Sequence, residues 1–193
     1  RVCRIPASRR AVRNPPNPGM RPRPTRGYLT LFAPACAFVD LETTGTVATA
    51  DRITETGIVR VIDGRPEEEW STLANPGCSI PPEIQRLTGI TNAMVAEAPT
   101  FAEIRHDVLD RLKDHLFIAH NARFDYGFIK NAFRRAGTPF SADALCTVRL
   151  SRRIYPEHRH HGLDAIIERH RLAGANRHRA LGDARLIWEF VQA

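Results

Sequence analysis

The pattern of apolar and polar residues changes sharply at about residue 35. Residues 35–41 form a short, nearly continuous apolar run, which predicts a buried β-strand. Asp63-Gly64 is a turn sequence with strand-like segments on both sides, so it predicts a β-hairpin. The strand-like segments that follow the first are residues 53–62, 69–74, 116–119 and 144–147.

Helical periodicity accounts for most of the rest of the chain. Phe101, Ile104, Val108 and Leu112 fall on one face of residues 100–112, as in an amphipathic helix. Because the strands come first as a meander and then alternate with helices, we predict an α/β protein with a mixed sheet and helices on both faces. The other predicted helices are residues 81–87, 123–136, 148–154, 163–170 and 180–191.

Residues 1–34 differ from the rest in composition. They hold seven of the 14 prolines, and such a segment cannot bury enough apolar surface to fold. Residues 1–36 carry eight arginines and no acid, whereas residues 37–193 carry 20 basic and 21 acidic groups. We therefore predict a disordered Arg/Pro-rich extension over residues 1–34 and a folded domain over residues 35–193. The extension has the charge to attract nucleic acid; a solvated leader without a binding role is the alternative.

Composition also excludes several classes of protein. No apolar run approaches the length of a membrane span, and the basic N-terminus lacks the apolar stretch of a signal peptide. The four cysteines are widely separated and form no C-x-x-C pair, so a zinc ribbon or redox motif is not expected. These features predict a cytoplasmic protein with reduced cysteines and no membrane partner.

Two acids share one face of the first predicted strand. Because side chains alternate along a strand, Phe38, Asp40 and Glu42 lie on one face, and Val39 and Leu41 on the other. Carboxylates on a buried face repel each other and are costly to desolvate. The pattern therefore favours a bound positive charge, although a strand end that emerges into water would give the same sequence.

Two further acids lie on the apolar faces of predicted helices. Asp125 lies on the stripe of the helix at residues 123–136, and Asp183 begins that of the helix at residues 180–191. Each could instead be an acid stabilised by its helix dipole. His178 lies just before the second helix, where a loop can bring it beside the same acids. Such an oxygen donor set suits Mg²⁺, and two cations about 3.5–4 Å apart are the usual arrangement for phosphodiester cleavage.

Three motifs carry a resemblance to a known family. The sequences FVDLETTG, HNARFD and HRALGD, which end at Gly45, Asp125 and Asp183, resemble in order and spacing the motifs of the DEDDh (DnaQ-like) 3′–5′ exonuclease superfamily. That superfamily includes the epsilon proofreading subunit of bacterial DNA polymerase III. Residues 84–91 also resemble its segment between the first two motifs. The resemblance covers about residues 37–193 and implies a ribonuclease H-like fold, with a five-stranded mixed sheet flanked by helices.

The resemblance also implies a role for each motif residue. Asp40, Glu42, Asp125 and Asp183 would bind two divalent cations, Mg²⁺ or Mn²⁺, and His178 would be the general base. The implied reaction is hydrolysis of the 3′-terminal phosphodiester of DNA to nucleoside 5′-monophosphates, in proofreading or repair in a bacterial cytoplasm. The residues implied to contact the substrate are Thr43, Thr44, Ile90, His120, Asn121 and Phe124. Packing is the alternative role for Ile90 and Phe124, and strand propensity is the alternative explanation for the two threonines.

Three alternatives stay open at this level. The motifs are shared with RNA exonucleases, because the contact to the 2′-OH that separates the two substrates is not visible in them. A module that docks onto a DNA polymerase subunit is a second alternative, against which the intact acids and His178 argue. The third is that the chain is the front portion of a longer protein, because it stops directly after the last predicted helix. Its first residue is Arg, which would fit a fragment, a processed form, or a true start at Met20. Residues 152–161 faintly resemble exonucleases that carry an additional domain.

Overall fold

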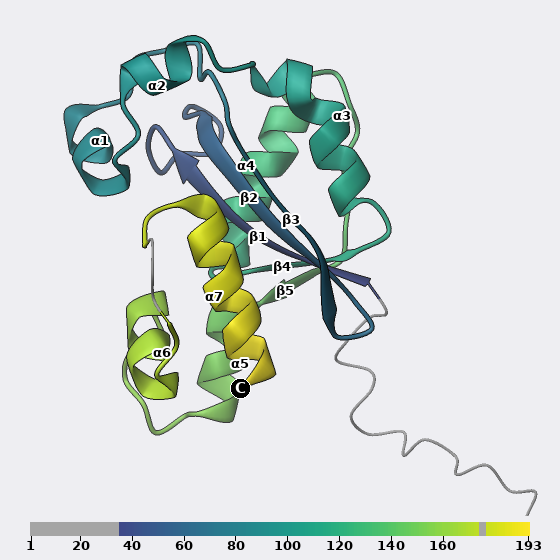
Figure 1. The fold of residues 1–193 in the computed structure, drawn as a ribbon, viewed down its shortest axis with the longest axis vertical. Coiled ribbons are helices and arrows are strands. Elements are labelled where there is room, and N and C mark those ends of the chain that lie inside the picture. The colour runs from purple at the N-terminus through teal and green to yellow at the C-terminus, as the bar shows by residue number, and fades with distance from the viewer. Residues whose placement is uncertain (1–34, 174–176) are drawn as a thin grey trace, which may run out of the picture. The chain divides into compact units, whose positions relative to one another are not determined.

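Five strands form one mixed sheet in the computed structural model, which describes residues 35–173 and 177–193 (Figure 1). The extension predicted at residues 1–34 lies outside the described residues. The order across the sheet is β3-β2-β1-β4-β5. β1 pairs antiparallel with β2 and parallel with β4, which confirms the predicted mixed sheet. The strands are β1 (Ala35–Thr43), β2 (Ile53–Ile62), β3 (Arg65–Leu73), β4 (Leu116–Ala119) and β5 (Ala144–Cys146).

The predicted hairpin is present, but its second strand differs from the prediction. Asp63 and Gly64 have φ angles of 50° and 75°, as a two-residue hairpin turn requires. β3 begins at Arg65, directly after the turn, and not at residue 69. The sequence pattern missed its first residues because β3 is an edge strand. Its exposed charged side chains and Pro66 give no apolar alternation.

Seven helices occur within the described residues, and six of them were predicted to within one residue at each end. The exception is α2, which is too short to show helical periodicity. Its start is stabilised by Thr91, whose side chain accepts a hydrogen bond from the backbone N–H of Met94. The helices are α1 (Pro82–Thr88), α2 (Asn92–Ala96), α3 (Phe101–Leu112), α4 (Ala122–Arg135), α5 (Thr147–Ile154), α6 (Leu163–His170) and α7 (Ala180–Gln192).

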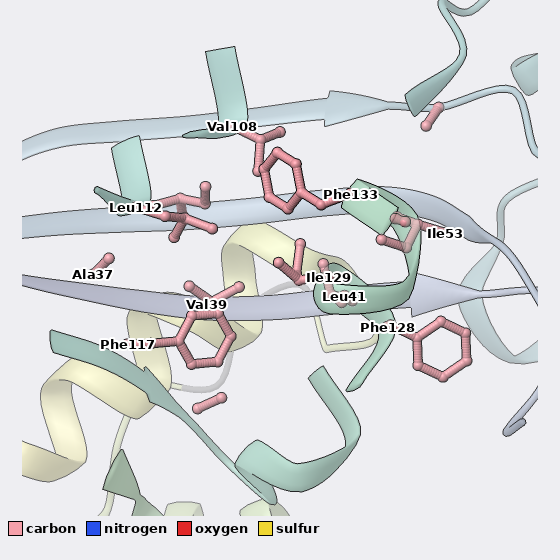
Figure 2. Packing of buried hydrophobic residues seen from close by; sticks show 14 of the residues in the cluster. Ala37, Val39, Leu41, Ile53, Val108, Leu112, Phe117, Phe128, Ile129 and Phe133 are labelled. Atoms are coloured by element: carbon pink, nitrogen blue, oxygen red, sulfur yellow. The ribbon is translucent and has the colours of Figure 1, made fainter. Parts of the chain in front are cut away.

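One face of the sheet is covered by α3 and α4. The buried side chains on this face come from the odd-numbered residues of β1, from the neighbouring strands and from the two helices. Their burial supplies the main driving force for folding, and it fixes the start of α4 beside the end of β1. Figure 2 shows this cluster, in which the labelled residues are Ala37, Val39, Leu41, Ile53, Val108, Leu112, Phe117, Phe128, Ile129 and Phe133.

The opposite face of the sheet packs against α7, which lies across β1 and β2 (Figure 1). Phe38 from β1 meets Trp188 from α7 edge to face, with ring centroids 5.2 Å apart. Because side chains alternate, Asp40 and Glu42 follow Phe38 on this same face. The packing of Phe38 therefore directs both acids toward the start of α7. None of the helices in the described part of the chain is both long and apolar enough to span a membrane.

Candidate active site

Acids from β1 and α7 meet at the end of the sheet. One carboxylate oxygen from each of Asp40, Glu42 and Asp183 lies within 4.8 Å of the other two. Asp183 is buried in the first turn of α7, whereas Asp40 and Glu42 are half-buried. The two predicted segments thus come together across 140 residues of sequence, as the motif spacing suggested.

The fourth predicted acid, Asp125, lies beside this group. It is buried in the first turn of α4, and its carboxylate is hydrogen-bonded to the backbone of Leu41, between the two acids of β1. Its charge also acts on Asp40, whose pKa it helps to raise. The structure therefore gathers all four predicted acids at one place.

Burial and mutual repulsion raise the pKa values of Asp40, Glu42 and Asp125. Burial is the largest cause of the raised pKa of Asp40, and the charges of Asp125, Asp183 and Glu42 add to it. Burial also raises the pKa of Glu42 to about 7 and that of Asp125 to about 8. The site therefore holds more negative charge than the protein alone stabilises near neutral pH.

A basic residue and the predicted general base lie in the segment just before α7. Arg177 forms an ion pair with Asp183 and another with Asp164, 2.9 Å away. His178 is half-buried and has a φ angle of 59°, and its backbone N–H donates to the Asp183 carboxylate over 3.3 Å. This bond fixes the backbone of His178 next to Asp183, and the role of its imidazole as general base stays a prediction.

Two residues that the sequence analysis did not select hold the start of α7 against β2. Glu55 is buried and accepts hydrogen bonds from Arg179, over 2.6 Å, and from the backbone N–H of Ala180, over 3.0 Å. A Cβ atom on Gly57 would lie 2.3 Å from backbone atoms of Ala180 and Leu181. In the sequence, the only signal for Glu55 was an acid inside a predicted strand. The structure shows that the residues on both sides of it in β2 are buried.

The predicted substrate-contacting threonines lie directly after Glu42. Thr43 and Thr44 are both buried. The hydroxyl group of Thr43 donates to the carbonyl of Gly45 over 2.6 Å, and that of Thr44 accepts from the backbone N–H of Arg52 over 3.0 Å. Both hydroxyls therefore shape the loop after β1, and their contact with a substrate stays a prediction.

The other predicted contact residues fall into two places. His120, Asn121 and Phe124 lie between β4 and the first turn of α4, next to Asp125. His120 bonds the Thr147 hydroxyl over 3.0 Å, and burial lowers its pKa to about 4. Phe124 is half-buried against Phe128, with ring centroids 4.7 Å apart.

Ile90 belongs to a separate, small hydrophobic cluster. It is completely buried and packs with Ile80 and Val95. The neighbouring segment also encloses its backbone, whose N–H donates to the Thr88 hydroxyl over 3.1 Å. This environment favours packing over a direct contact with a terminal base.

The donor set fits hard divalent cations. All its ligand atoms are carboxylate oxygens, which Mg²⁺ and Mn²⁺ prefer. One oxygen of Asp183, Oδ1, is buried and has no hydrogen-bond partner among the described residues. Buried polar atoms without partners are rare in folded proteins. A cation bound between Asp40, Glu42 and Asp183 would satisfy this oxygen and neutralise the repulsion.

The raised pKa values predict how stability depends on pH and on metal. The folded protein keeps protons on Glu42 up to about pH 7 and on Asp125 up to about pH 8, whereas the unfolded chain releases them near about pH 4. In EDTA, these groups therefore reduce stability as the pH rises from about 4 to about 8. A divalent cation replaces the protons, so its stabilising effect should grow over the same range.

Thermal unfolding measures this effect. At a concentration about 100 times the dissociation constant measured at about pH 8.5, Mg²⁺ or Mn²⁺ should raise the Tm at that pH by roughly 5–10 °C. The same concentration should raise the Tm by less at about pH 6. The Asp125→Asn variant should show a weaker dependence on pH in EDTA. Equal metal-induced shifts at both pH values would contradict the assignment of these carboxylates as ligands.

Comparison with known proteins places the chain in a family. Residues 37–190 match the RNase_T family model, described as exonuclease. The chain is 42% identical over 167 residues to a Mycobacterium tuberculosis protein assigned as a bifunctional exonuclease/endonuclease, covering 80% of this chain and 25% of that protein. It is 38% identical to the 3′-5′ exonuclease DinG of Staphylococcus haemolyticus, covering 77% of this chain and 17% of DinG. The chain thus spans a quarter or less of these curated relatives.

Solved structures agree with the fold. Exonuclease X in complex with 5′-overhanging duplex DNA superposes with a TM-score of 0.63 and 29% identity, covering 81% of this chain and 91% of that one. Exonuclease I of E. coli, in a zinc-bound complex with single-stranded DNA, has a TM-score of 0.75 at 18% identity, covering 82% of this chain and 39% of that one. Together with the sheet order, these matches confirm the ribonuclease H-like exonuclease fold. The chain therefore belongs to the RNase_T family of DnaQ-like 3′–5′ exonucleases, which are hydrolases of phosphodiester bonds.

Proposed function

We propose that the chain hydrolyses the 3′-terminal phosphodiester of a DNA strand, using Mg²⁺ or Mn²⁺, and releases nucleoside 5′-monophosphates. The observation that carries the proposal is the meeting of Asp40, Glu42 and Asp183 within 4.8 Å, with Asp125 beside them. The DNA complexes of exonuclease X and exonuclease I support DNA as the substrate. We further propose a role in proofreading or repair in a bacterial cytoplasm. Cell fractionation that finds the protein outside the cytoplasm would contradict that location.

The chemistry follows from the residues around the acids. Asp40, Glu42, Asp125 and Asp183 would hold two divalent cations, which when bound lower the pKa of a water molecule and stabilise charge on the phosphate. An imidazole nitrogen of His178 accepts a proton from the attacking water. The water oxygen forms a bond to phosphorus, the bond to the 3′ oxygen breaks, and that oxygen takes up a proton. The backbone bond from His178 to Asp183 supports this role.

The terminal nucleotide is proposed to lie between the loop after β1 and the start of α4. Thr43 and Thr44 shape one side, next to Glu42. His120, Asn121 and Phe124 form the other side, next to Asp125. His120 is neutral at pH 7, because burial lowers its pKa to about 4, so it would contribute a hydrogen bond and no charge.

A nuclease assay tests the function. The protein is incubated with 5′-labelled single-stranded DNA or RNA of one sequence, in Mg²⁺, Mn²⁺ or EDTA. We expect metal-dependent shortening from the 3′ end that is faster on DNA. His178→Gln should lower kcat by about 10²–10⁴-fold, whereas His106→Gln, at an exposed position on α3, should not change it.

The same assay separates the alternatives. Faster shortening of RNA would favour an RNA exonuclease. No shortening of either strand by folded, metal-loaded protein would favour a module that docks onto a DNA polymerase. A chain without residues 1–34, which we propose to be a disordered extension outside the catalytic domain, should keep its kcat and at most bind substrate more weakly. A large loss of kcat would show that the extension belongs to the fold.

A further inference from the structure

A group of arginines covers the surface formed by α5 and the start of α4. Arg149, Arg152 and Arg153 lie on α5, and Arg123 lies in the first turn of α4. All four are exposed. Within residues 35–173 and 177–193, none of the four forms an ion pair or a hydrogen bond through its side chain. Because residues 37–193 carry slightly more acidic than basic groups, this cluster is a local excess of positive charge.

The position of α5 is fixed from its inner side. Thr147 and Ser151 are completely buried there. Thr147 bonds His120 over 3.0 Å, and Ser151 bonds His161 over 2.8 Å. Since residues four apart share a helix face, Thr147 and Ser151 mark the inner face of α5, and its three arginines lie off that face and are exposed. Three of the four arginines thus lie on a helix that is hydrogen-bonded to the end of β4.

The arginines line two adjoining hollows. One has a volume of about 740 Å³ and is lined by Arg123, Arg149 and Arg152, together with His120 and Tyr126. The other has a volume of about 750 Å³ and is lined by Arg149, Arg152 and Arg153, with apolar residues from β4 and β5. The two hollows share Ala144, Cys146, Arg149 and Arg152 in their linings, and we call them together the α5 groove. Neither lining includes an acidic residue.

Part of the α5 groove lies close in the fold to the strand that carries Asp40. His120 and Asn121, which line the first hollow, directly follow β4, and Ile118 of β4 pairs with Phe38 of β1, two residues before Asp40. The charge of Arg177, which is paired with Asp183, also reaches His120. A strand whose 3′ end lay at the acids could therefore continue into the α5 groove in the 5′ direction.

We propose that the α5 groove binds the sugar–phosphate backbone of the substrate strand on the 5′ side of the terminal nucleotide. Four unpaired arginines without a neighbouring acid in the groove suit a run of phosphates, and arginine binds phosphate with two parallel hydrogen bonds. The apolar and aromatic parts of the lining offer surfaces to the bases. This inference rests on the proposed function, because it takes the polarity of the strand from cleavage at its 3′ end.

Binding measured without cleavage tests the groove. Anisotropy of a 5′-labelled single strand of about 20 nucleotides is followed in EDTA at several salt concentrations. Arg149→Gln/Arg152→Gln should raise the Kd by roughly tenfold and make the slope of log K against log salt less steep by about 1.4, since each phosphate contact contributes about 0.7. Arg65→Gln/Arg134→Gln removes the same charge on β3 and at the end of α4, outside the groove, and should leave both values unchanged.

Cleavage of two substrates gives an independent readout. The groove variant should raise the KM for the long strand and leave kcat unchanged, whereas hydrolysis of a dinucleotide, which cannot reach the groove, should not change. Parental Kd and salt slope in the groove variant would overturn the proposal, and so would absence of binding by the parent at low salt. If the groove binds an acidic protein and not the substrate strand, the groove variant will have the parental Kd and salt slope for DNA. Binding without cleavage would instead refute only the proposed function.

Discussion

Asp40→Asn is expected to abolish nuclease activity while making the metal-free protein more stable. The substitution keeps the shape of the side chain but removes one negative ligand from the group formed with Glu42 and Asp183. The bound metal stabilises the transition state by several kcal/mol, and losing this stabilisation should lower kcat by about 10³-fold or more. In EDTA the same change removes the Asp40 carboxyl group, whose pKa is raised by burial and by its acidic neighbours, so the Tm should increase at a pH where that group is ionised.

Asp63→Asn is the matched control. Asp63 is exposed in the turn between β2 and β3, where asparagine is well tolerated. It should leave both kcat and the Tm in EDTA unchanged. An Asp40→Asn enzyme that retains a tenth or more of its activity would exclude Asp40 as an essential ligand. A lower Tm in EDTA would show that attraction to Arg177 outweighs the repulsion between the acids.

Gly57→Ala is expected to damage both the fold and the site. The added methyl group would lie 2.3 Å from backbone atoms of Ala180 and Leu181, so β2 and the start of α7 would have to move apart. Overpacking of this kind costs about 1–3 kcal/mol or more, equivalent to a decrease in Tm of roughly 2–4 °C for each kcal/mol. Because Asp183 lies in that first turn of α7, a displacement of about 1 Å should lower kcat by about 100-fold.

Gly127→Ala serves as the control for this change. Gly127 lies within α4, and a Cβ atom there would meet its nearest neighbour, Ala48 Cβ, at an ordinary 3.6 Å. Alanine in a helix is more stable than glycine by about 0.5–1 kcal/mol, so the Tm should be unchanged or higher. If Gly57→Ala has the Tm and kcat of the parent, the start of α7 does not depend on close contact with β2.

The sequence predicted most of the fold because its local signals agree with one another. Six helices have apolar periodicity or clear start and stop residues, such as the proline and Gly89 that bound α1, and they lie within one residue of their predicted ends. The sequence signals failed where an element is held in place mainly by backbone pairing with a neighbouring strand. β3 was predicted too short, because its first residues pair with β2 through their backbones and expose polar side chains. α2 was missed because it is only five residues long.

The sequence by itself determined which acids form the candidate site. Alternation along β1 puts Asp40 and Glu42 on the face of Phe38, and helical spacing puts Asp125 and Asp183 on buried faces. These are local geometric rules that hold whatever the rest of the fold does. The resemblance to an exonuclease family then linked the three segments, and the structure brings them together.

Only the tertiary structure decided how the acids are supported and where a strand would run. Glu55 accepts a hydrogen bond from Arg179, 124 residues away in sequence, and the lack of a side chain at Gly57 leaves room for the backbone of α7. Neither contact follows from a local pattern. The α5 groove likewise combines Arg123 from α4 with arginines of α5 that are separated from it by β5. Such groupings depend on which elements pack together, and this depends on the burial of the whole core and not on any single segment.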